Sequence, residues 1–332
     1  MAQILDTSTN LKYPVRAHHT LGRSAEKVDT TVAGDMVSRI HAALEWNGQN
    51  WSLRDLSRNG TWLRDTRVSP KETVPLSVGE DLHFGHPRGP AWQLVEDSPP
   101  RSLLVGITPD TETLELSPYL FLPNDEEPRM VVTFSSERQC WFRHSVTELS
   151  RPEMESALQH REVLTCADKQ WRVFLADSAD ATKQQLQEKQ LDEFEFVFDL
   201  SLDEENTGLR LEHQHRHQAV NLGERSHHYL LLHLARQRAV EASRGLDQRS
   251  QGWIDSEQLA RDLGVDMSHI NILIFRARKQ LAQSLAGAFG SEQLVERGRG
   301  RVRFGCPRFR IYKGEHLAYA LPLAESAYAP HP

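Results

Sequence analysis

Three short polar motifs stand in order near the start of the chain, and their residue types suit the recognition of phosphate. They are Gly22-Arg23-Ser24, Ser38-Arg39-Ile40-His41 and the segment DLSRNGTW at residues 55–62. An arginine guanidinium presents a planar fork of donors that matches phosphate oxygens. A phosphothreonine carries nearly two negative charges and three acceptor oxygens. Each motif alone is weak, since Asn-Gly-Thr is mostly a tight turn. Together they predict a group of phosphate-binding loops.

Taken together, the three motifs resemble the forkhead-associated (FHA) domain over about residues 15–97. The resemblance implies an all-β sandwich whose loops at one end bind phosphothreonine peptides. It makes Arg23 the main phosphate ligand, Ser38 a hydroxyl donor and Asn59 a holder of the peptide backbone. The residues expected to bind phosphopeptide are Arg23, Ser38, Arg39, Arg58 and Asn59. Those expected to shape the loops, with His41 as a brace, are Gly22, His41, Gly60 and Thr61.

A second group of cations lies near the end of the chain. A helix expected from about Asp266 or Ser268 to about Leu285 has an apolar stripe with the spacing of one helical face. The stripe consists of Ile270, Leu273, Ile274, Ala277 and Leu281. The opposite face carries His269, Arg276, Lys279 and Gln283, with Asn271 and Arg278 beside it. Such a helix is suited to bury one face and offer the other to DNA.

An arginine-rich segment follows this helix. Between residues 297 and 310 there are six arginines and no acidic residue. Arg299, Arg301 and Arg303 alternate, so on a strand their side chains project from one face. This spacing predicts a basic β-hairpin suited to phosphate or minor-groove contact.

Residues of about 191–313 resemble the winged-helix effector domain of OmpR/PhoB-type response regulators. In both, β-strands are followed by three helices and then by a basic hairpin. The matching motifs are RARKQL at 276–281 and RGRG at 297–300. The resemblance implies an α+β winged helix-turn-helix domain that binds double-stranded DNA, with a homodimer on DNA as one arrangement. The DNA-binding residues it implies are His269, Asn271, Arg276, Arg278, Lys279, Arg297, Arg299, Arg301 and Arg303.

Two residues of the third helix depart from that family's pattern. Phe275 stands where these domains usually have a small polar residue, and Ile272 lies among the base-reading positions. Either side chain suits contact with a thymine methyl group. Both equally suit a patch that binds another protein.

Other motifs point to neither catalysis nor metal binding. His213, His215 and His217 alternate, but no carboxylate pattern accompanies them, so we expect no metal site. No nucleophile–base motif, phosphate-binding P-loop or dinucleotide fingerprint occurs. We therefore expect a protein that is not an enzyme and needs no cofactor.

Residue composition and hydrophobic patterning along the chain predict a multidomain fold of five segments. They are an FHA sandwich at 1–98, a β-rich middle region of unknown role at 101–180, a linker at 181–190, the winged-helix domain at 191–313 and a tail at 314–332. Alternating apolar residues over 194–202 predict a strand. A hairpin is expected around 209–222, and helices over 228–241 and 256–263. Asp255 and Gly264 are suited to cap the second of these helices.

Composition places the chain among water-soluble proteins with separated charge. The 332 residues are 39% apolar and 26% charged, with a net charge of −7. Residues 207–313 hold 18 basic and 10 acidic residues, a net of +8, which leaves −15 for the remainder. Adding the seven acids of 192–205 lowers the first value to +1. No long apolar run, secretory signal or disulfide-like cysteine pattern occurs, so we expect a cytoplasmic protein.

These observations predict a phosphothreonine-peptide-binding transcriptional regulator. Its FHA domain would dock on a phosphoprotein of a Ser/Thr-kinase pathway, and its winged helix would bind DNA. The alternative is an adaptor in such a pathway, in which the C-terminal domain binds protein through Ile272 and Phe275 instead of DNA.

Overall fold

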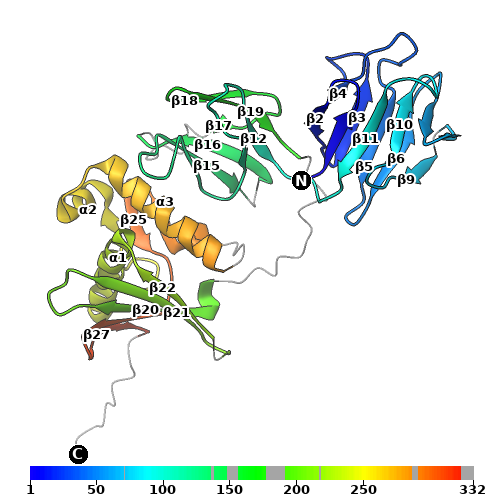
Figure 1. Cartoon of the computed structure of the whole chain (residues 1–332). Helices are drawn as coiled ribbons and strands as arrows, with labels where there is room; N and C mark the ends of the chain where they lie inside the picture. Colours follow the sequence, from blue (N-terminus) through cyan, green and yellow to red (C-terminus); the bar gives the residue numbers. More distant parts are fainter. Residues whose placement is uncertain are drawn as a thin grey trace, which may run out of the picture. The chain divides into compact units, whose positions relative to one another are not determined.

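The computed structural model describes residues 1–70, 72–135, 138–147, 156–176, 191–216, 218–285 and 291–322. The chain divides into two compact units (Figure 1). The first contains Met1–Leu116 and Leu158–Gln184. The second contains Ser117–Ala157 and Gln185–Pro332. The middle region that we predicted as one segment is thus shared between the two units. The predicted linker at 181–190 lies outside the described residues.

Two sheets packed face to face form the first part of unit 1. One has the order β2-β1-β11-β10-β7-β8, and the other has the order β4-β3-β5-β6-β9. Their strands are β1 (Gln3–Asp6), β2 (Leu11–Pro14), β3 (His18–Gly22), β4 (Thr30–Thr31), β5 (Ala42–Trp46), β6 (Trp51–Asp55), β7 (Thr61–Leu63), β8 (Thr66–Arg67), β9 (Thr73–Pro75), β10 (Asp81–Phe84) and β11 (Ala91–Glu96). All neighbours pair antiparallel except β3 with β4.

The core of this sandwich follows from the alternation of its strands. Along β6, Trp51, Leu53 and Asp55 are buried while the residues between them are partly exposed. Leu53 joins Ile4 and Leu94 of the facing sheet in one apolar cluster, as expected when strands with a period of two share a core. The first two strands extend the sandwich upstream of the 15–97 range in which we placed the resemblance.

A smaller sheet completes unit 1. It has the order β13-β12-β19-β18, and its strands pair antiparallel. They are β12 (Leu103–Gly106), β13 (Leu114–Glu115), β18 (Val163–Cys166) and β19 (Lys169–Phe174). Leu104, Leu164 and Trp171 are almost completely buried.

The second unit begins with another antiparallel sheet, β14-β15-β16-β17. Its strands are β14 (Leu120–Leu122), β15 (Met130–Ser135), β16 (Cys140–Ser145) and β17 (Ser156–Ala157).

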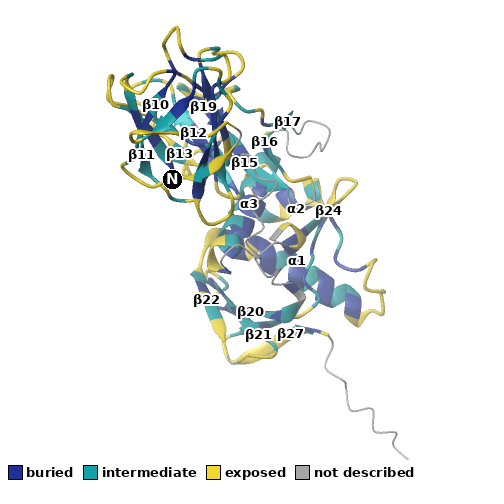
Figure 2. Ribbon diagram, turned by 90° about the vertical axis from the view of Figure 1, so that its right-hand side faces the viewer, coloured by how far each residue is buried: buried dark blue, intermediate teal, exposed yellow. Residues whose placement is uncertain are grey.

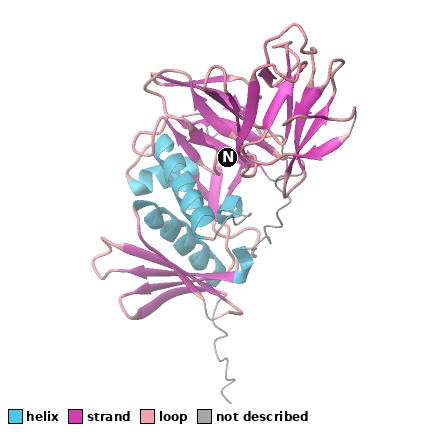
Figure 3. Cartoon of the chain, turned by 45° about the vertical axis from the view of Figure 1, so that its right-hand side comes forward, coloured by secondary structure: helices cyan, strands magenta, loops and turns pink. Residues whose placement is uncertain are grey.

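The rest of unit 2 is an α+β fold whose three α-helices are the only ones among the described residues (Figure 3). Its larger sheet, β22-β21-β20-β26-β27, has one parallel pair, β20 with β26. Its smaller sheet has the order β23-β25-β24. The helices are α1 (Ser226–Ser243), α2 (Ser256–Leu263) and α3 (Met267–Ser284), with short 3-10 turns at Leu191–Glu193 and Ser291–Leu294. The strands are β20 (Phe194–Leu200), β21 (Thr207–His213), β22 (Ala219–Glu224), β23 (Ile254–Asp255), β24 (Val295–Gly298), β25 (Arg301–Phe304), β26 (Phe309–Lys313) and β27 (His316–Leu321).

Local sequence signals fix the helix ends. The Asp255 carboxylate accepts hydrogen bonds from the backbone N–H groups of Glu257 and Gln258 at the start of α2. Gly264 ends α2 with φ of 66°, a left-handed conformation that glycine adopts at little cost. At the start of α3 the Asp266 carboxylate accepts from the N–H of His269. The expected helices and the hairpin of β21 and β22 therefore lie where we predicted them.

The predicted boundary at residue 313 differs from the structure. β27 pairs antiparallel with β26, so the large sheet continues to Leu321. The apolar residues of β26 and β27, among them Ile311 and Leu321, supply the reason, because they join the main core of this unit. The end of the predicted tail, 323–332, lies outside the described residues. None of the described helices is long and apolar enough to span a membrane.

Candidate functional site

Three loops of the sandwich bring the predicted phosphate-binding residues together. They connect β3 to β4, β4 to β5 and β6 to β7. The backbone N–H of Arg23 donates to the carbonyl of Ser38 at 3.0 Å. The backbone N–H of Arg58 donates to the Ser38 hydroxyl oxygen at 3.2 Å. Ser38 therefore lies between the two arginines, and the three motifs form one surface as the spacing predicted.

The guanidinium groups on this surface have no anionic partner. Arg23, Arg39 and Arg58 are exposed, and their side chains make no hydrogen bond or ion pair with any residue that the structure describes. Arginine side chains without an anionic partner, carried by adjoining loops, are suited to bind an anion that comes from outside. Figure 2 shows that loops at the ends of the sandwich strands are largely exposed.

The Asn59 loop is held by side-chain contacts. The Asn59 amide nitrogen donates to the carbonyl of Met36 at 2.7 Å. The Ser57 hydroxyl accepts from the N–H of Gly60 at 2.7 Å. Asp55 accepts from the Thr61 hydroxyl at 2.7 Å and from the N–H of Ser57 at 3.1 Å. The loop is thus ordered before any ligand arrives.

His41 braces two of the loops, as we predicted. It is fully buried, and its Nδ1 accepts from the N–H of Ser38 at 2.9 Å. Its Nε2 lies 3.0 Å from the carbonyl of Gly60 and must donate to it. Both contacts require the neutral ring with the proton on Nε2. Burial lowers the pKa of His41, although the bond to Gly60 raises it.

Two glycines are required by this geometry. A Cβ at position 22 would collide with the backbone carbonyl of Arg39. Gly60 has φ of 104°, which side-chain-bearing residues rarely adopt, and a Cβ there would meet the Arg67 guanidinium at 2.5 Å. Both residues therefore allow the close approach of loops, as expected.

Contacts that we did not predict hold the loop of Arg23. Arg161, from the segment before β18, donates to the carbonyls of Val28, of Asp29 at 3.1 Å and of Ala25 at 3.4 Å. No sequence signal identifies this arginine, because its partners lie more than 130 residues away. Its side chain ties the smaller sheet of unit 1 to the loop between β3 and β4.

Asp29 anchors the same loop from the other side. Its carboxylate accepts from Arg16 Nη1 at 2.9 Å and from the N–H and hydroxyl of Thr20 at 2.8 Å each. Burial raises the pKa of Asp29, but the Thr20 bonds and the Arg16 guanidinium lower it to about 2. The Arg16 Nε also donates to the carbonyl of Leu175 at 2.9 Å.

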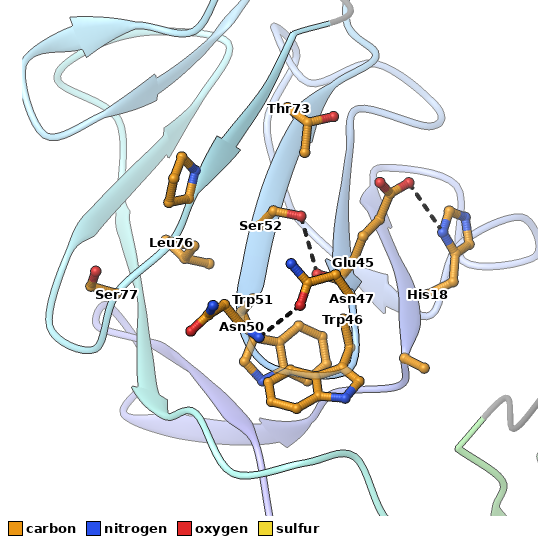
Figure 4. Close-up of a pocket in the computed structure, with 12 residues that line it drawn as sticks. His18, Glu45, Trp46, Asn47, Asn50, Trp51, Ser52, Thr73, Leu76 and Ser77 are labelled. Atoms are coloured by element: carbon orange, nitrogen blue, oxygen red, sulfur yellow. Dashed lines mark hydrogen bonds and ion pairs between the residues drawn. The ribbon is translucent and has the colours of Figure 1, made fainter. Parts of the chain in front are cut away.

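A pocket of about 740 Å³ lies at the far ends of β5 and β6 from His41 (Figure 4). The Trp46 and Trp51 rings, 5.3 Å apart between centroids, form its apolar part. The Glu45 carboxylate beside them faces His18 at 3.4 Å and also pairs with Arg54. None of the predicted site residues lines this pocket, and its charged group already has partners.

The predicted DNA-binding residues divide into exposed and occupied groups. Arg299 and Arg301 lie exposed at the turn between β24 and β25, and His269 is exposed on the first turn of α3. The side chains of Arg299 and Arg301 form no ion pair among the described residues. This hairpin therefore presents two free cations.

The prediction that Asn271 and Arg278 contact DNA is wrong, because both side chains are buried within the protein. Asn271 is 2% and Arg278 9% exposed. The Arg278 guanidinium donates to the carbonyls of Glu292 and Val295 at 2.8 and 2.7 Å. The Asn271 amide oxygen accepts from Arg297 at 2.9 Å. These side chains join α3 to the segment that follows it, because the chain returns over that flank of the helix.

Of the alternating arginines Arg299, Arg301 and Arg303, the last is occupied by contacts within the protein. Arg303 donates from Nη2 to the Glu296 carboxylate at 2.7 Å, and its guanidinium lies 4.7 Å from the Trp253 ring centroid. Arg303 therefore stabilises the hairpin by pairing its two strands. Farther along the chain, the Arg310 guanidinium forms ion pairs with Glu195 at 2.8 Å and with Glu212 at 2.7 Å. The predicted alternation of arginines is present, but carboxylates on neighbouring strands form ion pairs with Arg303 and Arg310.

The two remaining cations of α3 contact protein. Lys279 forms an ion pair with Asp125 at 2.7 Å, and Arg276 donates to the carbonyl of Asp125 at 2.8 Å.

His217, the last of the three alternating histidines, lies outside the described residues. Within the described ranges, no group of three or more His, Cys, Asp or Glu side chains is placed to hold a metal ion.

Comparisons with known proteins address the N-terminal sandwich. Residues 19–85 match the family model of the FHA domain. Among solved structures, the Mycobacterium tuberculosis EmbR complex with a low-affinity phosphopeptide is 25% identical, over 28% of this chain and 24% of that one, with a TM-score of 0.25. The matched part thus spans about a quarter of EmbR. The FhaA FHA domain, solved with an intracellular domain, is 26% identical over 28% of this chain and 99% of that one, also with a TM-score of 0.25. No curated protein matches the chain.

The family match covers β3 to the end of β10, and it includes all nine residues that we placed in or around the phosphate-binding loops. The match, the two facing sheets and the braced loops agree on the architecture. The chain therefore contains an FHA domain.

Proposed function

We propose that this protein is a phosphothreonine-dependent regulator and not an enzyme, and that its FHA domain binds phosphothreonine peptides. The observation that carries this proposal is that the backbones of Arg23 and Arg58 meet at Ser38, next to Arg39, while the guanidinium groups of all three arginines have no partner among the described residues. A dianionic phosphate ester supplies the charge that this surface lacks. Charge-assisted hydrogen bonds from arginine to phosphate are about twice as strong as neutral ones.

The roles of the individual residues follow from their positions. Arg23 and Arg58 approach the phosphate from two loops, and the Ser38 hydroxyl between them adds a donor. The Asn59 amide nitrogen is engaged by Met36, so its oxygen is oriented to accept from a backbone N–H of the peptide. Because these loops are already ordered, binding loses little conformational entropy.

The test uses the full chain and a library of phosphothreonine peptides with an unphosphorylated copy. The wild-type protein should retain only phosphorylated members, and Arg23→Ala should reduce their affinity at least 100-fold, since a charged hydrogen-bond pair contributes about 3 kcal/mol. Arg64→Ala is the matched control, because Arg64 is exposed beyond the other end of β7. Equal affinity of the two variants would contradict the site.

We further propose that the C-terminal part of unit 2 is a winged-helix domain that binds double-stranded DNA. Its support is the exposed hairpin with Arg299 and Arg301, which follows three helices in the order that the resemblance requires. Neutralising both arginines should reduce the slope of log affinity against log salt by about 2. Arg244→Ala, at the exposed end of α1, should leave that slope within about one unit.

One observation bears on the adaptor alternative, in which Ile272 and Phe275 would hold another protein: both side chains already pack inside this chain. Phe275 is 5% exposed, and with Ile272 it belongs to an apolar cluster built from protein side chains. If the full chain binds no duplex at low salt while phosphopeptide binding persists, the C-terminal part acts through protein contacts.

A further inference from the structure

The face of α3 that points away from the helical core is covered by the chain itself. Phe275 lies 5.9 Å from the Tyr119 ring and 6.0 Å from the His144 ring, measured between centroids. Tyr119 directly precedes β14 and His144 lies on β16, and both belong to the same unit as α3. The apolar cluster at this contact consists of Tyr119, Phe121, Val131, Val146, Ile272, Phe275 and Ala282. The two side chains that depart from the winged-helix pattern thus have an intramolecular partner.

Charge complementarity surrounds this cluster. Lys279 Nζ donates to both Asp125 carboxylate oxygens, at 2.7 and 2.9 Å, and lies 5.0 Å from the Phe121 ring centroid. Arg276 donates to the carbonyls of Asp125 at 2.8 Å and of Glu126 at 3.4 Å. The turn between β14 and β15 carries three consecutive acids, 125–127. It therefore presents oxygens to the same two cations that we predicted to contact DNA.

We infer that the outward face of α3 is a docking surface for residues 117–135 and 138–147, and that these segments and DNA compete for it. The inference rests on the proposed DNA binding. A recognition helix enters a major groove about 12 Å wide only when its outward face is bare. With the sheet in place, Phe275 is buried and Lys279 is paired, so the face of α3 that carries these two residues is not free to insert. The acidic turn takes the position that phosphate oxygens would occupy.

The strength of this contact sets the DNA affinity of the resting protein. Only the fraction of molecules with α3 uncovered is competent, and the apparent affinity falls by that fraction. The Asp125 side chain is 64% exposed, so its ion pair is partly screened by solvent. Removing that attraction should raise the open fraction severalfold without removing any residue of α3.

The test compares two variants of the full chain that change charge equally. Asp125→Lys places a cation against Lys279, whereas Glu205→Lys adds the same charge at an exposed loop of the large sheet. Binding to a mixed-sequence duplex of about 30 base pairs is measured by fluorescence anisotropy at several salt concentrations. We expect Asp125→Lys to bind at least about fivefold more tightly than Glu205→Lys, as expected for the loss of about 1 kcal/mol. Phe121→Ser, which adds no charge, should also bind more tightly than wild type.

Hydrogen exchange in the absence of DNA provides a second readout. Exchange in 120–135 should increase in Asp125→Lys and stay unchanged in Glu205→Lys. If all variants bind DNA but neither Asp125→Lys nor Phe121→Ser exceeds its control, the inference is overturned and the proposed DNA binding stands. If no variant binds DNA at low salt, both the proposed DNA binding and the competition fail.

Discussion

The brace formed by His41 offers a stringent test of how the FHA loops are held. In the His41→Ala variant, the N–H of Ser38 loses its partner, whereas the carbonyl of Gly60 loses the imidazole but keeps the bond from the N–H of Gly85 at 2.9 Å. An unsatisfied buried polar group costs about 1–3 kcal/mol. The imidazole also packs edge-on against Phe84, with 5.5 Å between ring centroids, and that contact is lost as well.

We expect the variant to lose roughly 3 kcal/mol of local stability in these loops, from one unsatisfied N–H and the lost ring packing. Domains commonly have about 5–15 kcal/mol in total, so the sandwich should remain folded at low temperature while its loops open. Phosphopeptide affinity should fall at least tenfold. This corresponds to a free-energy cost of about 1.4 kcal/mol for ordering the loops when the peptide binds. His41 touches no ligand in this scheme, so it acts only by positioning Ser38 and Gly60.

Hydrogen exchange and calorimetry separate these effects. Exchange should increase in 36–41 and 57–61 but not in the strand β6, and titration with a phosphothreonine peptide should give the weakened affinity. His18→Ala is the control, because His18 is half exposed and faces Glu45 at the other end of β5. If His41→Ala binds phosphopeptide as tightly as His18→Ala does, then the imidazole does not position these loops.

Two further expectations concern the same unit. His19 is 1% exposed, and burial lowers its pKa to about 4. The folded state therefore binds fewer protons than the unfolded state between pH 4 and pH 6.5. The contribution of neutral His19 to the free energy of unfolding is complete above pH 6.5 and is lost as the pH falls toward 4. The melting temperature should fall by roughly 10 °C between pH 7 and 5, at about 1.4 kcal/mol per pH unit, and an unchanged value would show that His19 titrates normally. Arg161→Ala should weaken phosphopeptide binding about fivefold, because a guanidinium that fixes three carbonyls of the Arg23 loop is lost. Arg172→Ala, exposed on β19, should leave binding unchanged; equal effects of the two variants would indicate a general loss of stability instead.

Local interactions explain why the FHA site was predictable. Several contacts of these loops are local: the Ser57 hydroxyl accepts from the backbone N–H of Gly60, and the Asp55 carboxylate accepts from the Thr61 hydroxyl. Such contacts leave a signature in residue type and spacing. The ends of α2 were predictable for the same reason, because a cap needs only the neighbouring N–H groups.

The contribution of Arg161 and the division of the middle region were not predictable. Arg161 acts on carbonyls more than 130 residues away, and carbonyls carry no sequence signal. The strands of 101–176 have similar composition, so nothing in their residues indicates that β12 and β19 join one unit while β15 and β16 join the other.

The sequence by itself determined that α3 has one apolar face and one basic face. The apolar face was assigned correctly, since Ile270 and Ile274 lie in the core. Only the tertiary structure decided what covers the rest: the segment after α3 buries Arg278, and the acidic turn at Asp125 pairs with Lys279. Periodicity reports which side chains share a face, whereas the occupant of that face depends on long-range packing that no local pattern encodes.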